Sequence, residues 1–182
     1  MSSHLQLPPG TSLAEVEAKM AEIQRQHHVA GRVCGDCTAC CTILQVVELN
    51  KPINTPCPHC TAHNCAIYSS RPLTCRIWSC EWWLGRLGLT DGQRPDKLGL
   101  MFAFDPDSPV IAYEVAPDAA KSKKAVKVLN RIKSERTLLL QRCGSRERVA
   151  LSGPLARQAA QAEPPFEPLD GRGGQAFNIR RP

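Results

Sequence analysis

The chain has 182 residues, of which 42% are apolar and 22% are charged, and its formal net charge is +6. This length suits one core or two small units and is enough to bury a core without covalent staples. No apolar run approaches the roughly 18 residues that a membrane-spanning helix needs, and the first residues lack the basic and apolar segments of a signal peptide. We therefore expect a cytoplasmic protein that neither spans a membrane nor is exported.

The chain divides into four predicted segments. They are an N-terminal helix in residues 1–30, a cysteine-rich metal-binding region in 31–90, an α+β unit in 91–155 and a disordered tail in 156–182. Ser12 and Glu15 form a capping-box pattern, which predicts that the first helix begins there and runs to about His28. The tail is rich in Pro, Gly and Arg, a composition typical of a disordered end.

The cysteine-rich region shows no long hydrophobic period. Ile43–Leu49 is predicted as a short strand, and Thr74–Leu87 as one helix that carries Trp78 and Trp82. Three prolines in residues 50–58 predict a loop. A region organised by a metal is expected to look like this, because the ligands replace much of the apolar core.

The following α+β unit contains one predicted helix, Asp118 to about Arg136, with Val126, Leu129 and Ile132 on its apolar face. Four runs rich in β-forming residues predict strands, and a turn at 105–109 joins the first two. The runs are Leu98–Phe104, Val110–Val115, Thr137–Arg142 and Arg148–Leu151. We therefore expect an α+β fold in which a loop-rich cysteine region, stapled by metal, packs on short antiparallel strands and two or three helices.

Nine of the ten cysteines lie between Cys34 and Cys80, and only Cys143 lies outside this window. Clustered cysteines in a reducing compartment are more often metal ligands or catalytic thiols than disulfides. Nine is also an odd number, which does not allow complete pairing within the window. The distribution therefore favours metal binding over a disulfide framework, and Cys143 is interpreted as a partly buried thiol without a role.

The order of the cysteines resembles a known pattern. Cys34-Gly-Asp-Cys37-Thr-Ala-Cys40-Cys41 is followed by a lone cysteine, by Cys65-Ala-Ile-Tyr-Ser-Ser-Arg-Pro-Leu-Thr-Cys75-Arg, and by Cys80. Over residues 34–80 this resembles the CxxCxxCC (YkgJ-like) family of zinc- or iron-chelating proteins. The resemblance implies metal chelation by Cys34, Cys37, Cys40, Cys41, Cys57, Cys65, Cys75 and Cys80. Cys60 stands where that family usually has an apolar residue.

The spacings themselves permit two kinds of centre. Cys34, Cys37 and Cys40 reproduce the first three ligands of a bacterial ferredoxin run, and a distant cysteine would complete a 4Fe-4S cluster. Cys41 is too close to be that fourth ligand, since adjacent cysteines tend to point apart. Alternatively, a CxxC pair at 34–37 or 37–40 with Cys57 and Cys60 fits a structural zinc ribbon. We favour the iron–sulfur cluster, because it does not depend on Cys60.

Several other side chains are candidates to support such a centre. Arg71 and Arg76 lie close in sequence to Cys75, where a cation would stabilise the negative charge of a four-thiolate site; capping of backbone carbonyls is the alternative. Tyr68 is expected to pack beside the site and exclude water. The three tryptophans between residues 78 and 83 are expected to shield it. His59 and His63 are interpreted as loop residues.

The charge of the chain is uneven, which bears on possible partners. Residues 1–120 carry a net charge of −3 and residues 121–182 carry +9. The lysines at 121–133 could bind nucleic acid, but a solvated helix face is the favoured interpretation. We therefore expect a metal-binding protein whose centre is structural or passes electrons to a redox or protein partner not yet identified. Two alternatives stay open: an enzyme that uses the cluster in redox or methyl-transfer chemistry, as some flagellin lysine N-methylases with a similar cysteine cluster suggest, and a zinc-ribbon module that binds nucleic acid.

Overall fold

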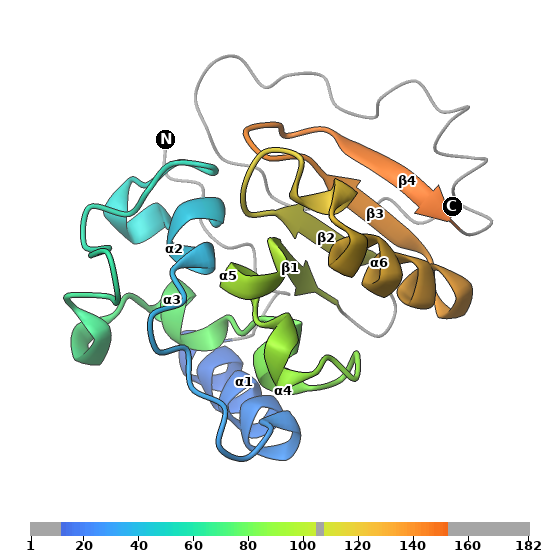
Figure 1. Cartoon of the computed structure of the whole chain (residues 1–182). Helices are drawn as coiled ribbons and strands as arrows, with labels where there is room; N and C mark the ends of the chain where they lie inside the picture. The colour runs from blue at the N-terminus through green and yellow to red at the C-terminus, as the bar shows by residue number, and fades with distance from the viewer. Residues whose placement is uncertain (1–11, 105–107, 153–182) are drawn as a thin grey trace, which may run out of the picture.

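The computed structural model describes residues 12–104 and 108–152, and it has an α+β fold (Figure 1). The predicted tail lies outside this part of the chain, as do residues 105–107 of the predicted turn. No helix in the described part is long and apolar enough to cross a membrane. The helices are α1 (Leu13–His27), α2 (Ala39–Ile43), α3 (Leu73–Ile77), α4 (Glu81–Leu84), α5 (Pro95–Leu98) and α6 (Lys123–Glu135). The 3-10 turns are η1 (Val47–Leu49), η2 (Tyr68–Ser70), η3 (Asp91–Gln93) and η4 (Ala119–Lys121).

Four strands form one sheet in sequence order. They are β1 (Leu100–Ala103), β2 (Val110–Glu114), β3 (Leu138–Gln141) and β4 (Arg148–Ser152). β1 pairs with β2 and β3 with β4 in antiparallel fashion, but β2 and β3 are parallel, with Val110 opposite Leu138. The prediction of antiparallel strands is therefore wrong at the centre of the sheet. The physical reason is α6, which lies between β2 and β3 in the chain and returns it to the start of a parallel strand.

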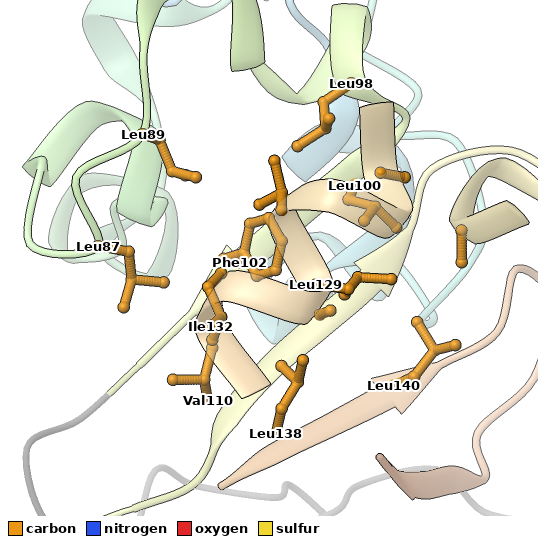
Figure 2. Packing of buried hydrophobic residues seen from close by; sticks show 14 of the residues in the cluster. Leu87, Leu89, Leu98, Leu100, Phe102, Val110, Leu129, Ile132, Leu138 and Leu140 are labelled. Carbon is orange, nitrogen blue, oxygen red and sulfur yellow. The ribbon is translucent and has the colours of Figure 1, made fainter. Parts of the chain in front are cut away.

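One face of the sheet carries the larger apolar core (Figure 2). Alternate strand residues, including Leu100, Phe102 and Leu138, point to this face and pack with α6 and the segment 87–98. The buried residues of α6 are Ala125, Val128, Leu129 and Ile132, whose spacing of three and four residues marks one helical face. The prediction placed Val126 on this face and is wrong, because Val126 is exposed and Val128 packs in the core instead.

The opposite face of the sheet is covered by part of the cysteine-rich region. Met101 of β1 and Tyr113 of β2 pack against Ala39 and Ile43 of α2. Cys37, Cys40 and Cys80 pack against this second cluster, together with Trp78. Cys80 also contacts the larger core. Several of the thiols therefore pack against this face of the sheet.

Helix α1 confirms its prediction and docks through polar contacts. Ser12 and Glu15 form the capping box, and the helix ends at His27. The Gln24 side chain donates to the Arg76 carbonyl and to Ser79 Oγ, both at 3.0 Å, and Arg76 pairs with Glu17 at 2.6 Å. Because no residue of α1 is buried, these contacts fasten the helix to the outside of the cysteine-rich region.

Two predictions within the cysteine-rich region are wrong. Residues 43–49 do not form a strand: α2 ends at Ile43, one bridge pairs Val46 with Lys51, and η1 lies between them. The predicted helix at 74–87 is broken into α3 and α4, because Trp78 and Cys80 have extended backbone. In both segments the contacts of the thiols and the sheet outweigh the local apolar pattern.

A long-range contact ties this region to the far end of the sheet. Asn54 has a left-handed backbone (φ 58°), and its side chain donates to the Ser145 carbonyl at 3.0 Å, across 91 residues of chain. The same carbonyl accepts from Gln141 of β3 at 3.0 Å. The loop that leads to Cys57 is thus held to the turn between β3 and β4.

Candidate metal centre

All ten cysteines are free thiols, and nine of them have an intermediate exposure. Only Cys57 is buried, at 9% exposure, and the other nine are partly buried. Thiols at this depth are shielded from bulk water but still reachable, which is the setting in which cysteines bind metals or react. The question is therefore which of them the fold brings together.

The CxxCxxCC segment is folded by its own backbone. The Cys37 amide donates to the Cys34 carbonyl at 2.9 Å, and Gly35 within this turn has a φ of 54°, in the region that favours glycine. The Cys37 thiol accepts hydrogen bonds from the amides of Ala39 and Asp96. Cys37 is therefore fixed between α2 and α5.

Cys40 and Cys41 lie in the first turn of α2, and their thiols meet. We expected adjacent cysteines to point apart, but the Cys40 and Cys41 side chains share a hydrogen bond. This bond raises the pKa of Cys40 and lowers that of Cys41; hydrogen bonding with Cys60 and the charges of Lys51 and Arg71 lower the Cys41 pKa further. Cys41 is therefore the thiol with the strongest thiolate character in this pair, and the thiolate is the form that binds metal.

The loop that carries Cys57 and Cys60 closes on Cys41. The Cys57 amide donates to the Cys41 carbonyl, and the Cys60 amide to the Cys57 carbonyl, both at 2.9 Å. Thr38 and Cys41 are hydrogen-bonded to the Cys60 side chain. Cys65 is joined to this loop by a single β-bridge with Cys60. The structure therefore places Cys60, which we had not selected, next to Cys41.

Cys75 and Cys80 approach from the two halves of the broken helix. Cys75, in α3, lies within electrostatic range of Cys41 and Cys57, and burial raises its pKa to about 11. Cys80 precedes α4 and lies within electrostatic range of Cys34 and Cys37; burial raises its pKa to about 12. Cys40 is likewise in range of Cys34 and Cys80. Cys75 and Cys80 thus face different partners.

Three cations lie among these thiols, and two of them were missed by sequence reasoning. Lys51 is only 3% exposed; its ammonium donates to the Thr42 and Pro52 carbonyls at 3.2 Å and to the Leu44 carbonyl. Burial lowers its pKa, and the thiols at 57, 41, 40 and 75 oppose this shift. Arg94 donates to the Cys34 carbonyl at 3.4 Å and pairs with Asp36 and Asp96. Lys51 lies six residues before Cys57 and Arg94 fourteen residues after Cys80, and it is the fold that brings them to the other thiols.

The third cation is Arg71, which was selected from the sequence. Its charge acts on Cys34, Cys41 and Cys75. Its guanidinium lies 3.7 Å from the centre of the Tyr68 ring, and its Nε donates to the Tyr68 carbonyl at 3.0 Å. Tyr68 itself is 54% exposed, so it supports Arg71 instead of excluding water from the thiols.

The remaining candidates lie around this group. Arg76 is turned to α1, where it pairs with Glu17. Trp78 packs with the thiols on the sheet, Trp82 is in the larger core with its Nε1 donating to the Thr90 carbonyl at 3.1 Å, and Trp83 stacks on His28 at 3.9 Å. His63 is exposed and His59 is partly buried. Cys143 lies at the other side of the sheet, where its amide donates to Glu114 at 3.2 Å.

The donor set fits a soft metal, since it consists of thiols with cations between them. In the described residues, however, no three His, Cys, Asp or Glu side chains are already gathered as a finished ligand set. Closing such a set would require side-chain movement, which metal binding commonly drives. Comparisons with protein-family models, curated proteins and solved structures give no match, so the function must be argued from these residues.

Proposed function

We propose that this chain is a metal-binding protein with a thiolate-ligated iron–sulfur centre, structural or electron-transferring, with zinc as the alternative metal. The observation that carries the proposal concerns four thiols, Cys34, Cys37, Cys40 and Cys80, whose side chains are not closed into a ligand set in the described residues. Three of the four pack against the same apolar cluster, and the fourth, Cys34, is in electrostatic range of Cys40 and Cys80. We call these four the sheet group.

The sheet group favours a cluster over a zinc ribbon. A ferredoxin-like run supplies three cysteines two residues apart and needs a distant fourth. The choice of Cys80 as that fourth ligand is supported by its electrostatic range to Cys34 and Cys37 and by its packing against the same apolar cluster as Cys37 and Cys40. A ribbon would instead pair Cys34 and Cys37 with Cys57 and Cys60, whose neighbour is Cys41.

The surroundings suit a negatively charged centre. Arg94 and Arg71 both act on Cys34, and fixed cations stabilise the charge of four thiolates and tune a cluster's potential. The apolar cluster of Met101 and Tyr113 below the thiols keeps water from one side. When bound, a cluster of this kind supplies one-electron chemistry; the residues around it hold it, balance its charge and limit its contact with water.

The resemblance of residues 34–80 to the zinc- or iron-chelating family agrees with this proposal. Both depend on the same CxxCxxCC segment and on the later cysteines, including Cys80.

The test is made on protein purified without oxygen. We expect a brown sample that absorbs near 400 nm, roughly the thiolate–iron charge-transfer region, with iron and acid-labile sulfide in matching amounts. Cys80→Ser should lose this signal, whereas Cys143→Ser, which alters a thiol outside the region, should keep it. A colourless sample with stoichiometric zinc would replace iron by zinc in the proposal. A sample with neither metal would refute it.

A further inference from the structure

Four of the six cysteines outside the sheet group form a second collection of thiols, to which Cys65 and Cys143 do not belong. These four lie around the ammonium of Lys51, and we call them the lysine group: Cys41, Cys57, Cys60 and Cys75. Three of them are in electrostatic range of Lys51, as is Cys40 of the sheet group. Cys60 joins them through its contact with Cys41 and its backbone bond to Cys57.

Helix α2 carries one member of each group. Consecutive residues of a helix are about 100° apart around its axis, so Cys40 and Cys41 can serve different sides although their thiols meet. Cys40 packs against the apolar cluster on the sheet. The backbone of Cys41 is bonded to the loop that carries Cys57, at 2.9 Å. The division between the groups therefore falls between two adjacent residues.

Each group also has a cation fixed beside it, and the charge of Arg71 acts on thiols of both groups. Arg94 is hydrogen-bonded to the Cys34 carbonyl, whereas Lys51 is 3% exposed and is held by three carbonyls in the loop next to the lysine group. A buried ammonium is costly unless negative charge compensates it. In the described structure the groups whose charge favours the Lys51 ammonium are thiols. Bound thiolates would supply that compensation permanently.

We propose that the lysine group is a second, separate metal site of the four-thiolate class that takes Zn²⁺. It rests on the proposed function only in assuming that the sheet group holds the first centre. Four thiols and a divalent cation form a closed tetrahedral site of the structural kind. Binding releases the thiol protons to solvent as the sulfur–metal bonds form, and no electron is transferred.

The test is a zinc titration of the reduced full-length chain after removal of metal with a chelator. Bound zinc is measured by elemental analysis after desalting. The wild-type chain should hold about two zinc ions, since Zn²⁺ can occupy either kind of four-thiolate site. The double variant Cys37→Ser/Cys80→Ser disables the sheet group and should still hold about one. Cys57→Ser/Cys75→Ser should also hold about one, and the fourfold variant none. Cys143→Ser is the control and should match the wild type.

Several outcomes would overturn the inference. If the wild type holds about one zinc ion and either double variant holds none, the thiols form one shared centre. If the wild type holds two zinc ions and either double variant holds none, both ions belong to one polynuclear centre. If Cys57→Ser/Cys75→Ser leaves the zinc content unchanged, the lysine group does not bind metal. A wild type that binds neither zinc nor iron would refute the proposed function as well, which separates the two failures.

Loss of folding in a variant is checked independently. Far-UV circular dichroism and the fluorescence of the buried Trp82 should match the wild type, because the larger core contains none of the substituted thiols except at its border with Cys80. A competition of wild-type zinc with a coloured chelator provides a measurement without substitutions. Two phases of release are expected, and a single phase that accounts for all bound zinc would contradict two separate sites.

Discussion

Removal of the Arg32 side chain should destabilise the fold strongly, although the residue lies outside every regular element. Arg32 is 9% exposed. Its guanidinium donates to the carbonyls of Trp82 and Leu89, pairs with Asp91 at 2.9 Å, and lies 5.0 Å from the Trp82 ring centre. These contacts of Arg32 therefore hold the segment just before Cys34 against the larger core.

The magnitude follows from these contacts. Arg32→Ala leaves two buried carbonyls without their donor, at about 1–3 kcal/mol each, and removes a cation–π contact of about 0.5–2 kcal/mol. The pair with Asp91 adds little, at about 0–1 kcal/mol, because Asp91 is 85% exposed. Allowing for partial relaxation, we expect the free energy of unfolding to fall by about 3–5 kcal/mol. The melting temperature should fall by roughly 10–15 °C.

The assay is thermal and urea unfolding of the metal-free, reduced chain, followed by circular dichroism. Arg25→Ala is the matched control, because Arg25 is 70% exposed and pairs only with the neighbouring Glu22 on α1 in the described structure; it should change stability by less than about 0.5 kcal/mol. Arg32→Lys should fall between the two, since it keeps the charge but not the fork of donors. If Arg32→Ala and Arg25→Ala melt at the same temperature, the contacts of Arg32 do not stabilise the fold and the reasoning is wrong.

Three further predictions concern other parts of the fold. Gly85→Ala should lower the unfolding free energy by about 1–3 kcal/mol, because the new Cβ would meet a side-chain atom at 2.4 Å with φ at 75°; Gly144→Ala, at φ 74° with nothing within 4 Å, should cost less in the same urea titration. Burial raises the pKa of Tyr113, so in Tyr68→Phe protein the midpoint of tyrosinate absorbance should lie at higher pH in the folded chain than in the chain unfolded by denaturant. This raised native pKa means that Tyr113 contributes stability that is present below the pKa of the unfolded state and is lost as the pH rises through the native pKa; equal midpoints in the folded and unfolded chain would contradict its burial. Lys51→Met should weaken zinc binding roughly 10- to 100-fold at the lysine group while Lys51→Arg weakens it less, and equal affinity in both variants would exclude a role for the charge.

The sequence was informative wherever local rules decide the structure. The capping box of Ser12 and Glu15 located the start of α1, and runs rich in β-forming residues located all four strands to within two residues at each end. The sequence was misleading where tertiary contacts decide the structure. The break in 74–87 depends on Cys80 reaching the sheet, and the parallel pairing of β2 and β3 depends on where α6 packs.

Residues of the candidate site were likewise predicted where the pattern is local and missed where it is not. The cysteines and Arg71 were identifiable from their spacing, because a ligand motif is a local pattern. Lys51 and Arg94 were not, since Lys51 lies within the proline-rich loop at residues 50–58, which gives no periodic signal, and Arg94 lies 60 residues from Cys34. The pairing of Cys41 with Cys60 was also missed, because the loop that brings them together carries no periodic signal.

The hydrogen bond from Asn54 to Ser145 has a consequence for synthesis of the chain. At about 5–20 residues per second, the 91 residues between them take roughly 5–20 s to be translated. During that interval the loop before Cys57 lacks its hydrogen bond to Ser145. The sheet is also incomplete, because β3, the parallel partner of β2, has not yet been made. The nascent thiols are therefore reachable by a metal donor, or by an oxidant, before the sheet closes beneath them.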